Sequence, residues 1–142
     1  MNIVMNAGTM RKGSKELAKL VNILIVSETF ATILVGSDAS DETALYALKE
    51  LGPEQVVITL RAGGSIGLNN HGIFRQKTFL ISAVDTTGAG DVYHGGYIYG
   101  LLKGWKMQEC TQFAFATAAL KRTEFGAQKG VPNLEDINAL LG

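Results

Sequence analysis

Short apolar runs alternate with amphipathic stretches along the first half of the chain. Three runs rich in β-branched residues have the length of buried strands, at residues 2–5, 22–26 and 55–60. The spacing of apolar residues predicts three helices between them, at about 14–21, 28–34 and 41–51. Ser14 is the expected cap of the first helix. This alternation predicts an α/β fold built on a mostly parallel sheet.

The second half of the chain begins with a hairpin pattern and ends in helices. A turn-rich segment at 69–72, Asn-Asn-His-Gly, separates strand-like residues 65–68 from 72–79. Three helices are predicted after it, at about 89–103, 107–123 and 133–141. The sequence contains no repeat, low-complexity tract or linker, so a single domain is expected.

One motif stands at a predicted strand-to-helix junction. Residues 85–91 read Asp-Thr-Thr-Gly-Ala-Gly-Asp, and the three small residues let the backbone turn tightly against a ligand. A helix N-terminus carries about half a positive charge, so the amides of Gly88, Ala89 and Gly90 are predicted to form an anion hole for a phosphate. Asp91 follows in the first helical turn, where its carboxylate can take a proton from an attacking hydroxyl.

A simpler interpretation is that Asp85 and Asp91 only cap a turn and a helix, since carboxylates are favoured at helix starts. The motif, however, combines two carboxylates, two hydroxyls and three small residues within seven positions. It also has the strand-then-helix context that such a site requires. We therefore favour a functional site over simple capping.

Composition and charge narrow the range of partners. With 142 residues, of which 46% are hydrophobic, the chain can bury a core, and thirteen basic residues balance thirteen acidic ones. This balance does not favour nucleic acid or an anionic membrane as a partner, and the apolar runs are shorter than the ~20 residues of a membrane helix. The single cysteine, Cys110, excludes an internal disulfide and is expected to be a buried filler. Small-molecule partners and a cytoplasmic location are expected.

The motif at 85–91 resembles the C-terminal signature of the ribokinase-like, PfkB-type carbohydrate kinases, in which D-T-x-G-A-G-D is followed by an aromatic and small residues. Tyr93, Gly95 and Gly96 continue that pattern. The resemblance implies a ribokinase-like three-layer sandwich and an ATP-dependent sugar kinase with Asp91 as base. Magnesium is implied because charge builds up on the phosphates of ATP during transfer.

Two further segments resemble nucleotide-binding parts of the same family. Thr59 and Gly64 match its loop T-x-G-x-x-G, with Arg61 at the place of the first glycine. A guanidinium there either pairs with phosphate or stands in solvent. The helix around Phe115 resembles the adenine-side helix, and Gly126 begins the G-A loop. Core packing is the alternative for Phe115 and is compatible with adenine binding.

The family's metal positions are matched less closely. Ser27 and Phe30 stand at the asparagine and glutamate of its N-x-x-E segment, which helps to organise magnesium and phosphate. Glu28 lies two residues early, and an acid at a helix start is the simpler account. In relatives that use a monovalent cation, oxygens come from positions that include Asp85 and Thr87, so the resemblance also suggests potassium.

The resemblance covers residues 2–141 and matches only the C-terminal half of the family. A parallel strand at the start of the chain, with no preceding partner, likewise indicates a sheet that begins within a domain. The leading hypothesis is the nucleotide-binding and catalytic half of a sugar kinase, which works with an N-terminal half or as a homo-oligomer. The alternative is a nucleotide-binding fragment or degenerate subunit without transferase activity of its own. The identity of the sugar stays open, and His94 either faces that sugar or is structural.

Overall fold

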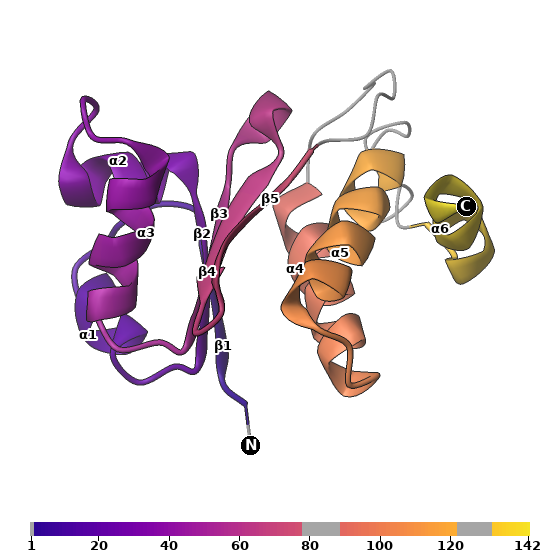
Figure 1. Cartoon of the computed structure of the whole chain (residues 1–142), viewed down its shortest axis with the longest axis horizontal. Coiled ribbons are helices and arrows are strands. Elements are labelled where there is room, and N and C mark those ends of the chain that lie inside the picture. The colour runs from indigo at the N-terminus through magenta and orange to yellow at the C-terminus, as the bar shows by residue number, and fades with distance from the viewer. Residues whose placement is uncertain (1, 78–88, 122–131) are drawn as a thin grey trace. The chain divides into compact units, whose positions relative to one another are not determined.

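The computed structural model describes residues 2–77, 89–121 and 132–142, in two compact units. The first unit, Met1–Lys77, is a five-stranded sheet with three helices on one face (Figure 1). Its elements are β1 (Val4–Ala7), α1 (Ser14–Ala18), β2 (Ile23–Ser27), α2 (Glu28–Val35), α3 (Asp41–Glu50), β3 (Gln55–Thr59), the 3-10 turn η1 (Arg61–Gly63), β4 (Ser65–Asn69) and β5 (Gly72–Gln76). The predicted α/β class is confirmed.

The order of the strands in the sheet equals their order in the chain. β1, β2 and β3 are parallel, whereas β4 pairs antiparallel with β3 and β5 antiparallel with β4. The predicted hairpin is therefore confirmed, and the amide of His71 donates to Asn69 Oδ1 (2.8 Å) in its turn. The three parallel strands end at one edge of the sheet, where α/β proteins bind their ligands.

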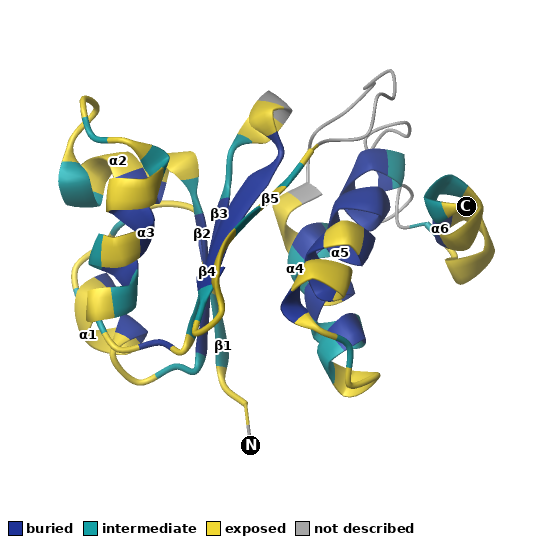
Figure 2. Ribbon diagram, in the orientation of Figure 1, coloured by how far each residue is buried: buried dark blue, intermediate teal, exposed yellow. Residues whose placement is uncertain are grey.

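Alternate strand residues form the core beneath the helices, as Figure 2 shows for the buried centre of the sheet. Val26 of β2 and Ile58 of β3 are each 1% exposed, and Phe30 of α2 and Leu45 of α3 are fully buried in the same cluster. Burying such a side chain stabilises the fold by roughly 1.5–3 kcal/mol. This packing holds the first turn of α2 against the sheet.

The first strand begins at Val4, two residues later than predicted, because the backbone of Ile3 makes hydrogen bonds outside the strand ladder. The amide of Ile3 donates to Asn22 Oδ1 (2.8 Å), and Ile3 O accepts from the amides of Asn22 and Ile23. Ladder pairing with β2 then runs from Val4 to Ala7. Asn6, predicted to follow the strand, is therefore part of it.

The prediction that Ser14 caps the first helix is wrong. Gly13 is the N-cap, with φ of 86°, and Ser14 is the first residue of α1. The Ser14 hydroxyl accepts instead from the amide of Arg11 (2.9 Å), while Ser14 N donates to Arg11 O (3.0 Å). The left-handed backbone at Gly13 brings the two residues together.

The second unit, Thr78–Gly142, contains α4 (Ala89–Leu102), α5 (Met107–Lys121) and α6 (Leu134–Leu141). Asn133 caps α6 by accepting from the amide of Asp136 (2.9 Å), and Ile137 of α6 joins Phe113 and Ala116 of α5 in a buried cluster. The predicted helices are confirmed over their described residues. None of the helices described is long and apolar enough to span a membrane.

Two glycines let α4 and α5 pack closely. A Cβ at Gly96 would lie 3.0 Å from Ala114 Cα, and one at Gly100 would lie 2.8 Å from Cys110 Sγ. Because Gly96 faces Ala114 and Gly100 faces Cys110, the two helices run antiparallel. When the same pairing is continued along the helices, Lys121 at the end of α5 falls opposite the start of α4. Cys110 is buried as predicted, and burial raises the pKa of its thiol to about 11.

Candidate active site

The carboxyl ends of β2 and β3 bring two of the sequence-predicted residues together. Ser27 and Thr59 are partners in the ladder between these strands. The Thr59 hydroxyl donates to Val26 O (3.3 Å), one residue before Ser27. Because this bond crosses between strands, it fixes the ends of β2 and β3 relative to each other.

Ser27 also connects the end of β2 to the end of β1. Its hydroxyl donates to Gly8 O (2.5 Å) and accepts from the amide of Phe30 (3.2 Å), so Ser27 caps α2 as well. Phe30, at the family's glutamate position, is fully buried in the core. It supplies no ligand atom, so only Glu28 offers a carboxylate at the start of α2.

The loop between β3 and β4 is a tight turn. Leu60 N donates to Gly64 O (2.8 Å) and Gly63 N donates to Leu60 O (2.8 Å). Arg61 is exposed and has φ of 52°, a left-handed conformation that is unusual for a side-chain-bearing residue. Gly64 has φ of 85°, and a Cβ there would lie 2.0 Å from Gln76 O. The loop therefore requires glycine at 64.

In the second unit, α4 begins at Ala89, so the helix N-terminus predicted for the motif is present. Gly90 and Asp91 are exposed in its first turn. The sequence-predicted residues Asp85, Thr87, Gly88 and Gly126 lie outside the described residues. The anion hole and the cation ligands thus stay predictions, as does the role of Asp91.

His94 lies one turn beyond Asp91 and is partly buried. Burial lowers its pKa, while the nearby carboxylate of Asp91 opposes that shift. His94 Nδ1 has no hydrogen-bond partner within the described part of the chain. Burial of His94 therefore disfavours its charged form, although the charge of Asp91 favours it.

Phe115 is buried, and its ring packs edge-on against Tyr93, with centroids 5.4 Å apart. Core packing, the alternative in the sequence prediction, is observed, and adenine contact stays a prediction. At the end of the same helix Lys121 is fully buried, and its Nζ has no hydrogen-bond partner among the residues described. Its position opposite the start of α4 could not be predicted without the helix register.

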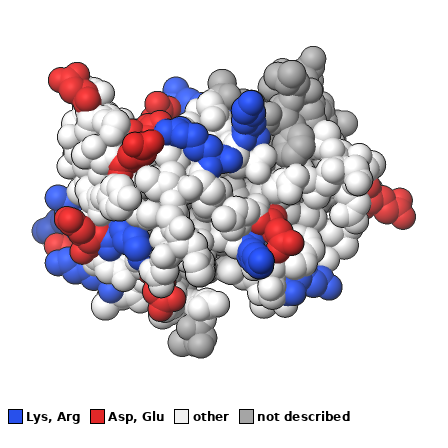
Figure 3. All heavy atoms as spheres, viewed as in Figure 1, with Lys and Arg blue, Asp and Glu red and all other residues white. Residues whose placement is uncertain are grey.

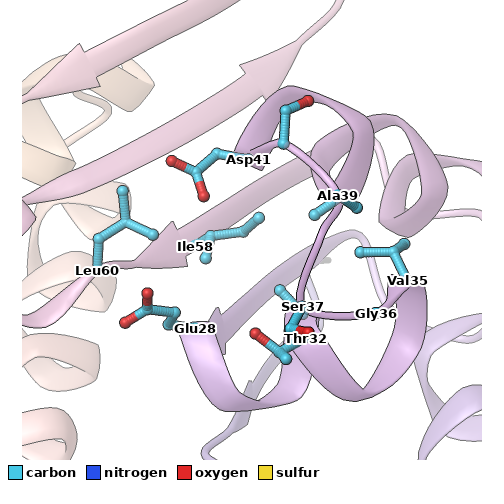
Figure 4. Close-up of a pocket in the computed structure, with 12 residues that line it drawn as sticks. Glu28, Thr32, Val35, Gly36, Ser37, Ala39, Asp41, Ile58 and Leu60 are labelled. Carbon is cyan, nitrogen blue, oxygen red and sulfur yellow. The ribbon is translucent and has the colours of Figure 1, made fainter.

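A cavity of about 90 Å³ lies between α2 and α3 (Figure 4). Glu28 and Asp41, at the starts of these helices, line it together with Ile58 and Leu60. Arg75 Nη1 of β5 lies 3.8 Å from Asp41 Oδ2. Because this ion pair is exposed to solvent, it contributes little to stability. The two acids are thus in different electrostatic surroundings.

The two acids that line this cavity are too few to bind Mg²⁺ without ligands from a substrate. Among the described residues, no group of three or more His, Cys, Asp or Glu side chains could hold a metal. Mg²⁺ is, however, commonly bound by one or two carboxylates together with the phosphates of a substrate. Glu28 fits that arrangement, in which the nucleotide supplies most of the ligands.

The sequence prediction missed a second group of polar residues at this edge of the sheet. Asn6, Thr9 and Arg11 line an open cavity of about 470 Å³ at the end of β1. The available signal was Asn6 in an otherwise apolar run, followed by Gly8. On the face shown in Figure 3, basic and acidic side chains are interspersed, in keeping with the balanced charge.

Comparisons with known proteins agree with this arrangement. The family model "pfkB family carbohydrate kinase" matches residues 1–134. The chain is 35% identical over 141 residues to a ribokinase of Haemophilus influenzae, covering 96% of this chain and 46% of the relative. It is 33% identical over 130 residues to an ATP-dependent 6-phosphofructokinase of Thermoanaerobacterium thermosaccharolyticum, covering 92% and 40%.

Solved structures give the same result. An Arabidopsis thaliana ribokinase complexed with ribose and ATP matches with a TM-score of 0.88 and 27% identity, over 99% of this chain and 47% of that one. The chain thus spans less than half the length of these relatives. The match over nearly the whole chain, in sequence and in structure, shows that it belongs to the pfkB family of carbohydrate kinases.

Proposed function

We propose that this chain is the nucleotide-binding and catalytic half of an ATP-dependent sugar kinase. The observation that carries the proposal is the exposed carboxylate of Asp91 in the first turn of α4. A carboxylate so placed can accept the proton of an attacking hydroxyl, while the helix N-terminus favours the charge of a phosphoryl group. Family membership supports the same chemistry.

The other predicted residues have separate roles in this proposal. The amides of Gly88, Ala89 and Gly90 hold the transferring phosphoryl group. The loop from Thr59 to Gly64, with Arg61, seats the phosphates, and Phe115 and Gly126 lie on the adenine side. A bound magnesium ion neutralises charge on the phosphates, with Glu28 as a carboxylate donor. Potassium at Asp85 and Thr87 stays part of the proposal, and an ATP complex of an E. coli relative with Mg²⁺ is in keeping with the metal.

The rival proposal is a nucleotide-binding subunit without transferase activity of its own. Its support is that Phe30, a buried core residue, stands where the family has a glutamate. An open half-site cannot exclude water or orient a sugar. Under this proposal the chain binds ATP, and turnover requires an N-terminal half or a second copy.

Calorimetry with ATP, with and without Mg²⁺, and a phosphotransfer screen over sugars separate the two proposals. The screen is run on the chain alone and with a polypeptide that supplies the N-terminal half of a pfkB-family kinase. Where turnover occurs, Asp91→Asn is expected to lower kcat by two or more orders of magnitude with ATP affinity unchanged. Glu109→Gln, which alters an exposed acid on α5, is the matched control. Near-normal turnover of Asp91→Asn would remove Asp91 as base, and ATP binding without turnover under any condition would favour the rival.

A further inference from the structure

The end of α5 holds a charged side chain that the described part of the fold leaves without a partner. Lys121 is fully buried, and its Nζ has no hydrogen bond or ion pair among the described residues. An ammonium group that is taken out of water without a counter-charge strongly disfavours the folded state. Such a group is typical of a functional site, where a bound ligand supplies the missing charge.

Lys121 lies on the side of α5 that packs against α4 (Figure 1). A Cβ at Gly96 of α4 would lie closest to Ala114 and Thr117 of α5. Lys121 follows Thr117 by four residues, so it continues the same side of α5 by one more turn. Because the two helices are antiparallel, that turn falls opposite the first turn of α4, which begins at Ala89. The buried ammonium is therefore within reach of the N-terminus of α4.

Two positive charges meet at this end of α4. The N-terminus of the helix carries about half a positive charge, and Lys121 adds a full charge from the side of α5. Asp91 is exposed and lies about 200° around α4 from Ala89, so it is on the opposite side of the helix. Glu109, the only other acid on these two helices, is at the far end of α5. The arrangement therefore favours an anion with more than one negative charge, such as a phosphate, at the tip of α4.

We propose that the Lys121 ammonium is a further catalytic group, which binds the phosphoryl group during its transfer at the start of α4. The inference rests on the proposed function, in which backbone amides hold that group. In the transfer, a bond forms between the acceptor oxygen and phosphorus, the bond from phosphorus to the leaving oxygen of ADP breaks, and Asp91 takes the proton of the acceptor. Lys121 keeps its own proton and offsets the negative charge of the phosphoryl oxygens, from the side of α4 opposite Asp91.

The first test is a titration of the 142-residue chain with inorganic pyrophosphate, followed by the amide signals in NMR. The signals of Gly90 and Asp91 are expected to shift until the site is saturated, while that of Leu102, at the other end of α4, stays in place. Lys121→Met keeps the length of the side chain and removes its charge, so it is expected to weaken pyrophosphate binding about tenfold or more. Lys103→Met, which alters an exposed lysine just after α4, is the matched control and should change the affinity by less than about twofold.

Urea unfolding separates a binding role of Lys121 from a structural one. Lys121→Met removes a buried charge that lacks compensation, so the ligand-free variant is expected to unfold at a higher urea concentration than the wild-type chain. Pyrophosphate should raise the unfolding midpoint of the wild-type chain more than that of the variant. A variant that is less stable than the wild-type chain and binds pyrophosphate equally well would show a structural lysine and overturn the inference.

Further outcomes decide between an anion site and a catalytic one. If Gly90 and Asp91 show no saturable shift in the wild-type chain, the inference is overturned whether or not the variant folds. Equal losses of affinity in Lys121→Met and Lys103→Met would overturn it as well. Where phosphotransfer occurs, Lys121→Met is expected to lower kcat about tenfold or more, and a loss confined to the KM for ATP would exclude a catalytic role. Absence of ATP binding and phosphotransfer, with pyrophosphate binding through Lys121 intact, would instead remove the proposed function and leave an anion site.

Discussion

Ser27 and Thr59 are the last registered pair of the β2–β3 ladder, and both hydroxyls bond to main-chain carbonyls on other strands or loops. Ser27 reaches Gly8 O beyond β1, and Thr59 reaches Val26 O of β2. Three parallel strand ends are thus joined by two side chains. A change at Ser27 should therefore affect more than the helix that it caps.

Ser27→Ala is expected to lower the free energy of unfolding by about 2 kcal/mol, because a helix cap and a bond to Gly8 O are lost together. Ser40→Ala is the matched control, since Ser40 caps α3 by accepting from Thr43 N. It should cost about 1 kcal/mol. Urea unfolding of both variants measures the difference. An equal loss would show that the bond to Gly8 O adds no stability.

Gly64→Ala is expected to destabilise the first unit by about 2–4 kcal/mol, since a Cβ there would lie 2.0 Å from Gln76 O on a backbone with φ of 85°. Gly72→Ala separates strain from collision, because Gly72 has φ of 123° and no atom of the described residues lies within 4 Å of its Cβ position. It should cost about 1–2 kcal/mol. Thermal unfolding measures both, and a smaller loss for Gly64→Ala than for Gly72→Ala would contradict the close approach.

Gly100→Ala is expected to lower the free energy of unfolding by about 1–3 kcal/mol, because its Cβ would lie 3.1 Å from Cys110 Cα. Gly95→Ala is the control on the same helix, since a Cβ at Gly95 would have no atom of the residues described within 4 Å. There alanine should stabilise α4 by up to about 1 kcal/mol. Urea unfolding measures whether the change in the free energy of unfolding has opposite signs in Gly100→Ala and Gly95→Ala. Two variants of the same sign would argue against close α4–α5 packing.

The stability of the chain should depend on pH through His94. Burial lowers the pKa of His94 in the folded state below 6.5, so the unfolded state takes up the proton more readily. This stability is present above pH 6.5 and is lost as the pH falls below it. His94→Gln is expected to flatten the dependence between pH 7.5 and 5.5, measured by urea unfolding. Asp91→Asn should make it steeper, because Asp91 opposes the shift. An unchanged slope in His94→Gln would contradict this assignment.

The sequence predicted the element types well, because apolar periodicity and caps act locally. Asn133 before α6 and the turn at 69–72 are examples. The start of β1 was wrong because Ile3 bonds to a side chain nineteen residues away, a contact without a local signal. The cap of α1 was wrong because a left-handed Gly13 takes the place of a side-chain cap.

The helix that follows the motif was predictable because Ala89, Gly90 and Asp91 are contiguous in the sequence, whereas their roles in a site stay predictions. Features that only the tertiary structure brings together could not be predicted. Arg11 becomes notable only because the loop after β1 lines an open cavity. Lys121 becomes notable only through its burial and the register of α4 with α5.

Arg61 is the one non-glycine residue with positive φ among those described, at 52°. For an L-residue this left-handed backbone conformation costs roughly 1–2 kcal/mol. The hydrogen bonds within residues 60–64 offset that cost and keep the turn in place. The turn after β3 therefore holds Arg61 in an unfavourable backbone conformation at the carboxyl end of β3. A partner that lets Arg61 return to negative φ would draw on that stored energy as it binds.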